Sequence, residues 1–306
     1  MNPNPTGTEL PELKTAIPGP QSVGLVDVLA RHECPAITAR RARRAAQLGR
    51  ASSDPIVWST AVGANVWDAD GNRFVDLTSG FGVALIGHRD SDVVAAARSQ
   101  ADRLLHAMGD AYPDETRIRL LERLAAVAPA GITHAILGLS GADAVDGAVK
   151  TAVLATGRPG VLTFTGGYHG LSLGTVPLQA YKPAFSHPFA GITNPHVEHL
   201  PWQADLEAVE RVLATGTIGL VLIEPVQGRG GIRVAPPDWI RAVSACAHRH
   251  GALVAYDEIQ CGLGRTGQIW AGPGNPEDGE PVVDLLCVGK QLGGGFPISA
   301  TLAPKP

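Results

Sequence analysis

The sequence lacks the patterns that mark membrane, metal-binding and disulfide-linked proteins. Its four cysteines include no C-x-x-C pair and stand at positions 34, 246, 261 and 287, so a reduced cytoplasmic location is expected. No apolar run reaches transmembrane length, and the opening M-N-P-N-P-T-G-T-E has no basic-then-apolar signal. The histidines show no metal-ligand spacing and H-E-x-x-H is absent, so no metal site is expected.

An excess of charge of one sign is also lacking. The net charge of −4 over 306 residues gives no reason to expect nucleic acid or a membrane surface as a partner. Hydrophobic residues make up 44% of the chain, enough to bury a sizeable core. The 37 glycines and 24 prolines are scattered without a repeat, which is typical of a loop-rich α/β enzyme. The length suits one large domain or two small ones.

The stretch D-L-L-C-V-G-K-Q-L-G-G-G places a lysine at the end of an apolar run. Leu285–Val288 is predicted to be a buried strand, and Lys290 follows it, with further glycines at 293–295. Desolvation lowers the pKa of an amine, which is about 10.4 when free, and makes it a nucleophile toward carbonyls. The alternative is a lysine that extends to water. A phosphate-loop motif does not fit, because Asp284 and Gln291 stand where glycine and Ser/Thr are required.

Two acids also follow predicted buried strands. Ala252–Tyr256 ends in Asp257, and the run that starts at Ile218 ends in Glu224. An acid at the carboxyl end of a strand faces the crevice where α/β folds bind ligands. A buried carboxylate without a partner is unfavourable, so Glu224 requires a donor. A lysine for a Schiff base with a carboxylate for a pyridinium nitrogen is the pairing that pyridoxal 5′-phosphate (PLP) requires.

Here the sequence resembles a known family. A-Y-D-E-I-Q-C-G-L-G-R-T-G, followed by D-L-L-C-V-G-K-Q-L-G-G-G-F-P, resembles the class III aminotransferases, PLP enzymes of fold type I. The resemblance begins near residue 55 and extends to the last residue. It implies that Lys290 attaches the cofactor covalently and that Asp257 pairs with the pyridine nitrogen. It also implies that Ile259 packs on one ring face and that Gln260 hydrogen-bonds near the phenolic oxygen.

A strand, a turn and a helix are predicted over residues 136–155. Ser140, Gly141 and Ala142 open the helix, whose free N–H groups and dipole form an anion site. Taken alone, a stretch of this kind is more often an ordinary capped helix than a phosphate site. Its resemblance to the family's S-G-[AS]-[ED]-A turn implies that the N–H groups of Gly141 and Ala142 hold the PLP phosphate.

Two further loops carry the resemblance. V-L-T-F-T-G-G-Y-H-G, residues 161–170, implies that Tyr168 stacks on PLP with His169 beside it, although a Tyr-His pair can also simply pack a turn. E-P-V-Q-G-R-G-G places Glu224 in the wall of the site. Arg229 departs from the acid that often stands at its position in the family, which puts an ornithine-type carboxylate switch in doubt.

The expected fold is α/β, the large domain of fold type I, a mainly parallel sheet with helices on both faces. Residues 1–80 are expected to form an N-terminal segment with a hairpin around Asp70-Gly71-Asn72, and residues 81–306 the PLP-binding domain. Family members continue well beyond Pro306. The chain is therefore expected to be a fragment or a truncated product that lacks most of the small domain.

The expected function is amino transfer from an ω-amino acid or amine to a 2-oxo acid, with Lys290 moving the proton. T-A-I-P-G-P-Q-S at 15–22 resembles 4-aminobutyrate-type members and favours a donor of that kind. The resemblance implies a homodimer of the full-length form. Two alternatives stay open: an aminomutase or racemase of the same fold, and a truncated, catalytically incompetent PLP-binding relative.

Overall fold

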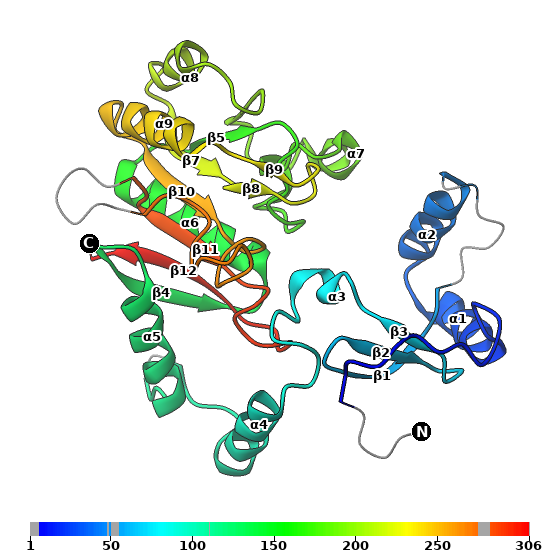
Figure 1. Cartoon of the computed structure of the whole chain (residues 1–306). Coiled ribbons are helices and arrows are strands. Elements are labelled where there is room, and N and C mark those ends of the chain that lie inside the picture. Colours follow the sequence, from blue (N-terminus) through cyan, green and yellow to red (C-terminus); the bar gives the residue numbers. More distant parts are fainter. Residues whose placement is uncertain (1–5, 48, 50–54, 110, 275–281, 306) are drawn as a thin grey trace. The chain divides into compact units, whose positions relative to one another are not determined.

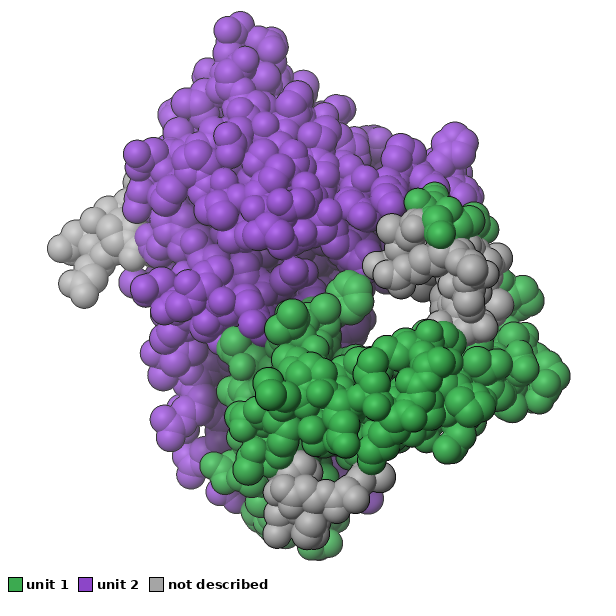
Figure 2. Space-filling view, turned by 45° about the vertical axis from the view of Figure 1, so that its right-hand side comes forward, with its two compact units in different colours: residues 1–103 green, residues 104–306 purple. Residues whose placement is uncertain are grey.

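The chain divides into two compact units in this computed structural model. The structure describes residues 6–47, 49, 55–109, 111–274 and 282–305. Unit 1 is Met1–Arg103 and unit 2 is Leu104–Pro306, shown in different colours in Figure 2. The domain boundary expected from the sequence, between residues 80 and 81, stays a prediction. It precedes helix α4 (Ser91–Arg103), whereas unit 1 includes that helix.

Unit 1 is built on a small antiparallel sheet with strand order β1-β2-β3. The predicted hairpin is confirmed: β2 and β3 pair antiparallel and are joined by a turn in which Gly71 has φ +83°, a conformation that favours glycine. The segment before α1 docks on this turn, because Asn72 Oδ1 accepts from the N–H of Lys14 at 2.7 Å. Besides α4, the elements of unit 1 are α1 (Pro20–His32), α2 (Pro35–Gln47), β1 (Trp58–Val62), β2 (Asn65–Asp68), β3 (Arg73–Val75) and α3 (Ser79–Gly82).

Unit 2 is organised around a seven-stranded sheet of order β4-β12-β11-β10-β7-β5-β6. β12 is antiparallel to both neighbours, and the other pairs are parallel. The predicted α/β fold with a mainly parallel sheet is therefore confirmed. The strands are β4 (Ile132–Gly138), β5 (Gly160–Phe164), β6 (Val197–Leu200), β7 (Ile218–Ile223), β10 (Leu253–Asp257), β11 (Leu285–Val288) and β12 (Ser299–Pro304).

Helices cover both faces of this sheet (Figure 1). In β7, Val221 and Ile223 pack with the core beneath the helices of one face, while Leu220 and Leu222 pack against α6 on the other. Both faces of the central strand are thus buried, which is why it appears in sequence as an unbroken apolar run. The helices are α6 (Gly141–Thr156) on one face, and α5 (Glu115–Val127), α8 (Leu206–Leu213) and α9 (Pro237–Arg249) on the other.

Smaller elements complete unit 2. A two-stranded antiparallel ribbon pairs β8 (Val226–Gln227) with β9 (Arg233–Val234). α7 (Pro183–Ser186) lies between two 3₁₀ turns, η1 (Val176–Leu178) and η2 (His187–Phe189). In sequence, α7 follows β5 and the ribbon follows β7.

Helix α6 packs closely against β12. Thr301 Oγ1 donates to the carbonyl of Ala144 at 2.6 Å, and a Cβ at Gly147 would overlap Thr301 Oγ1. Glycine within a helix is unfavourable by about 1 kcal/mol relative to alanine. At Gly147 the absence of a side chain allows α6 to approach the sheet. This close approach sets the position of the first turn of α6.

Within the ranges described above, no helix is long and apolar enough to cross a membrane. The same residues contain no group of three or more His, Cys, Asp or Glu side chains arranged to hold a metal ion.

Candidate active site

The residues singled out from the sequence lie in unit 2 and follow the carboxyl ends of parallel strands. These ends meet along one edge of the sheet, where α/β folds form their crevice. The structure places them after five strands: Ser140, Gly141 and Ala142 after β4, Tyr168 and His169 after β5, Glu224 after β7, Asp257, Ile259 and Gln260 at the end of β10, and Lys290 after β11.

Asp257 is held by two hydrogen bonds. Its Oδ2 lies 2.8 Å from Nδ1 of His169, with both side chains buried, and its Oδ1 accepts from the N–H of Ile259 at 3.1 Å. Because a carboxylate only accepts, the imidazole carries its proton on Nδ1. Burial alone lowers the pKa of His169, but the hydrogen bond to Asp257 and the charges of Asp257 and Glu224 outweigh it and raise that pKa. The pair therefore presents an oriented carboxylate.

Glu224 finds its donors in the backbone. It is 7% exposed and accepts from the N–H of Tyr168 at 2.8 Å and of Gly228 at 3.3 Å. Burial raises the pKa of Glu224 to about 7; the charge of His169 opposes this rise and that of Asp257 adds to it. The glutamate thus fixes the loop that carries Tyr168 and changes charge near neutral pH.

Lys290 is half-buried, and desolvation lowers its pKa. The charges of Asp257 and Glu224 oppose this effect, and the charge of Arg229 reinforces it. A lowered pKa increases the fraction of neutral amine, the form that attacks carbonyl carbon.

Glycines bring the lysine segment next to the first turn of α6. A Cβ at Gly289 would lie 3.3 Å from Ile259 Cγ2 and 3.7 Å from the Cα of Gly141. A Cβ at Gly141 would lie 2.9 Å from the same Ile259 methyl. Ile259 therefore lies between the two glycines, and the residue after Gly289 is Lys290.

The first turn of α6 is capped reciprocally. The N–H of Asp143 donates to Ser140 Oγ at 3.2 Å, and Asp143 Oδ2 accepts from the N–H groups of Leu139 and Ser140. These backbone donors lower the pKa of Asp143. Among the hydrogen bonds of the described residues, none uses the N–H of Gly141 or Ala142. These two N–H groups, at the positive end of the helix dipole, can therefore donate to a bound anion.

Sequence reasoning missed several contacts of the site. The guanidinium of Arg229 lies over the ring of Tyr168, with Cζ 4.1 Å from the centroid, and Tyr181 meets that ring edge-on at 6.4 Å. Gln291 Nε2 donates to the carbonyl of Gln260 at 2.7 Å and ties the lysine segment to the end of β10. An arginine between Gly228 and Gly230 was the only signal in the sequence, and it does not identify the ring over which the guanidinium lies.

A family model described as aminotransferase class-III matches residues 48–306. The chain is 36% identical over 249 residues to an acetylornithine aminotransferase of Methanopyrus kandleri, with 81% of this chain and 62% of the relative covered. It is 36% identical over 267 residues to a 2-aminoadipate transaminase of Pseudomonas putida, with 82% and 62% covered.

Solved structures resemble the chain as well. An N-acetylornithine aminotransferase from Stenotrophomonas maltophilia matches with a TM-score of 0.67 and 32% identity, over 82% of this chain and 62% of that one. An ornithine aminotransferase from Toxoplasma gondii matches with a TM-score of 0.77 and 26% identity, over 95% and 64%. The chain spans about three fifths of the length of the curated relatives it matches.

Proposed function

Because the chain belongs to the class III aminotransferases, we propose that it binds PLP in unit 2 and serves the transfer of an amino group from an amino donor to a 2-oxo acid. One observation carries the proposal. A half-buried lysine of lowered pKa, a carboxylate oriented by a histidine, and the open first turn of a helix lie at the same edge of the sheet. Each matches one chemical group of the cofactor.

The residues present fit those groups. The N–H groups of Gly141 and Ala142 would hold the phosphate, as helix N-termini commonly do. The carboxylate of Asp257 would pair with the pyridine nitrogen and favour its protonated form. Ile259 is placed against the first turn of α6 by Gly141 and would supply an apolar contact for the ring. Tyr168, Gln260 and the other residues implied by the resemblance stay proposals of the same kind.

When bound, PLP supplies an aldehyde that reacts with amines and a conjugated ring that accepts electrons from a bond broken at the substrate carbon. The work of the chain is to place protons and charges. Lys290 Nζ, made less basic by desolvation, would accept and carry the proton that leaves the substrate carbon. His169 Nδ1–H holds the carboxylate of Asp257 in its orientation. Glu224 holds the backbone of Tyr168 in place.

The amino donor is proposed to be an ω-amino acid. The relatives named above are an acetylornithine, an ornithine and a 2-aminoadipate aminotransferase, which supports N-acetylornithine as the first donor to test. The segment T-A-I-P-G-P-Q-S supports 4-aminobutyrate as the second. The family resemblance also supports a homodimer of the whole protein, which light scattering after gel filtration would test.

Covalent attachment tests the proposal directly. The full chain, incubated with PLP, is expected to develop the visible absorbance of lysine-bound cofactor, and borohydride reduction followed by peptide mass spectrometry is expected to place the adduct on Lys290. Lys290→Ala should lose the adduct. Lys150→Ala, at an exposed lysine of α6, is the matched control and should keep it. An adduct that persists in Lys290→Ala would contradict the assignment.

Product analysis separates the other candidate activities. A transaminase releases a free oxo product from the donor and leaves aminated cofactor, whereas an aminomutase or racemase releases no oxo product from a single substrate. A chain that forms the adduct but converts no donor would be a PLP-binding relative without activity.

A further inference from the structure

We propose that Asp146 and Ser172 are positioning residues that hold the loop after His169 against the first two turns of α6, and that this contact strengthens binding of the cofactor's phosphate. The inference rests on the proposed function, which assigns the phosphate to backbone N–H groups of the first turn. Neither residue would touch the cofactor. Both would act through the loop, which comprises residues 170–175.

The 170–175 loop runs along α6. At Gly170, whose φ is +114°, an added Cβ would lie 2.9 Å from the Cβ of Ala142. At Gly174, an added Cβ would overlap Asp146 Oδ1. Ala142 and Asp146 are four residues apart and therefore lie on the same side of the helix, one turn from each other. The loop backbone thus contacts two successive turns of α6, and glycine at both loop positions allows this approach.

Hydrogen bonds fix the loop to the helix. Ser172 Oγ donates to Asp146 Oδ2 at 2.9 Å. Thr175 is fully buried, its N–H donates to the carbonyl of Ser172 at 3.0 Å, and its Oγ1 lies 3.1 Å from Ser172 Oγ. A hydroxyl that donates to a carboxylate forms a charge-assisted bond, which is about twice as strong as a neutral one. The bond from Ser172 to Asp146 is therefore a strong link between the loop and α6.

The same loop directly follows a residue that orients Asp257. His169, whose Nδ1 lies 2.8 Å from Asp257 Oδ2, immediately precedes Gly170. Gly170 in turn packs against Ala142, whose N–H is proposed to hold the phosphate. The loop therefore connects the carboxylate proposed for the ring nitrogen with the turn proposed for the phosphate. Its attachment to α6 keeps Gly170 in place between the two.

Loss of this attachment should weaken phosphate binding selectively. Without the hydroxyl of Ser172, the loop can move away from α6, and Ala142 loses a neighbour that fixes its position. A phosphate that binds must then also order the loop and the turn, and this ordering lowers its affinity. A ligand without a phosphate does not use the turn, so its affinity should stay the same. A loop that only maintained the fold would affect both ligands alike.

Two amine forms of the cofactor test the inference without covalent attachment. The full chain, freed of PLP, is titrated with pyridoxamine 5′-phosphate and with pyridoxamine, which lacks the phosphate, and each Kd is measured calorimetrically. Ser172→Ala should weaken binding of pyridoxamine 5′-phosphate about tenfold, the change expected when a hydrogen bond to a charged group is lost, and should leave the Kd of pyridoxamine unchanged. Ser172→Thr keeps a hydroxyl and should bind both ligands as the wild type does.

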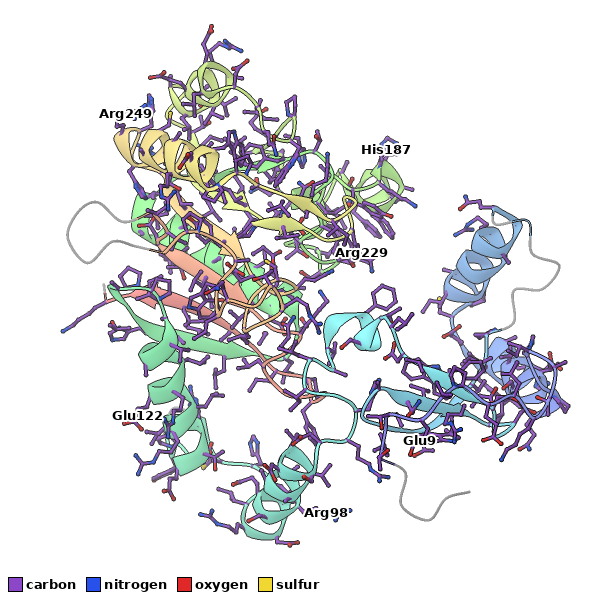
Figure 3. The ribbon with its side chains drawn as sticks, in the orientation of Figure 1. Glu9, Arg98, Glu122, His187, Arg229 and Arg249 are labelled. Carbon is purple, nitrogen blue, oxygen red and sulfur yellow. The ribbon has the colours of Figure 1, made fainter. Side chains whose placement is uncertain are left out.

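A second variant changes the acceptor of the same bond. Asp146→Asn keeps an oxygen for Ser172 but lacks the charge, so it should weaken binding of pyridoxamine 5′-phosphate by about threefold. Glu122→Gln is the matched control, because Glu122 is an exposed glutamate of α5 in the same unit (Figure 3). Its Kd for pyridoxamine 5′-phosphate should equal that of the wild type.

The outcomes separate the inference from the proposed function. If Ser172→Ala binds pyridoxamine 5′-phosphate as tightly as the wild type does, the inference is wrong while the proposed function stands. Equal losses for the two ligands would show that the loop only maintains the fold, which also overturns it. If Ser172→Ala does not fold, an unchanged Kd in Asp146→Asn overturns the inference and a loss confined to the phosphorylated ligand supports it. If the wild type forms no adduct at Lys290 with PLP, both fall.

Discussion

Replacing Glu224 by glutamine should flatten the pH dependence of stability. Glutamine has nearly the same shape, and its carbonyl oxygen can keep the 2.8 Å bond from the N–H of Tyr168. Its NH₂ group would face the N–H of Gly228, so the longer 3.3 Å bond is lost. That loss is expected to cost about 1 kcal/mol at every pH. The variant also lacks the negative charge that Glu224 acquires, in a buried position, when it loses its proton.

The sign and size of the effect follow from the pKa of Glu224. Folding raises that pKa from 4.5 to about 7. Between these values the folded chain keeps a proton that the unfolded chain has lost, so the free energy of unfolding falls as the pH rises. The contribution is complete below pH 4.5 and is lost through pH 7. It amounts to roughly 3 kcal/mol in total, of which about 2 kcal/mol lies between pH 5.5 and 8.

Urea unfolding followed by tryptophan fluorescence measures this difference. Between pH 5.5 and 8 the wild type should lose about 2 kcal/mol more of its free energy of unfolding than Glu224→Gln does. The raised pKa of His169 also makes the free energy of unfolding fall as the pH rises. Because the charge of Glu224 contributes to that raised pKa, the variant removes this contribution as well. Glu207→Gln, at an exposed glutamate of α8, is the control and should follow the wild type. Parallel pH profiles for the wild type and Glu224→Gln would refute the assignment.

Three further predictions concern the site. Asp257→Asn should lower the pKa of His169, because the hydrogen bond and charge that raise it are lost; an NMR titration with no downward shift would count against the pairing. Gly141→Ala should weaken PLP binding about tenfold or more, because the new Cβ would lie 2.9 Å from Ile259 Cγ2, and Ile259→Ala in the same chain should restore part of it. Ser140→Ala should lower the free energy of unfolding by about 1 kcal/mol through loss of the N-cap, and an unchanged thermal midpoint would argue against the capping box.

The central strands could be predicted from the sequence, and their order could not. β7, β10 and β11 are buried on both faces and therefore appear as continuous apolar runs. Nothing in the residues of β12 indicates that it lies antiparallel between β4 and β11. Strand direction depends on the end of the sheet from which the chain enters the strand. The residues of the strand itself do not determine this. Likewise the close approach of α6 became clear only when Gly147 was seen opposite Thr301.

The site shows the same division. Asp257 and Lys290 were accessible to sequence reasoning because a charged residue that ends an apolar run requires an explanation. The bond between Asp257 and His169 joins residues that are distant in sequence, and only the fold brings them together. The donors of Glu224 are backbone N–H groups, which every residue except proline possesses and which no sequence pattern can identify.

The charges of the site form one electrostatic system rather than a set of separate roles. Glu224, with a pKa of about 7, can hold a proton at neutral pH, while Asp257 lies against His169. A proton on Glu224 lowers the negative charge at this edge of the sheet, and the open first turn of α6 adds the positive end of its dipole. Both effects favour an anionic ligand such as the phosphate of the proposed cofactor. Deprotonation of Glu224 above pH 7 restores that negative charge, so the residue that fixes the Tyr168 loop also adjusts the attraction of the site for anions.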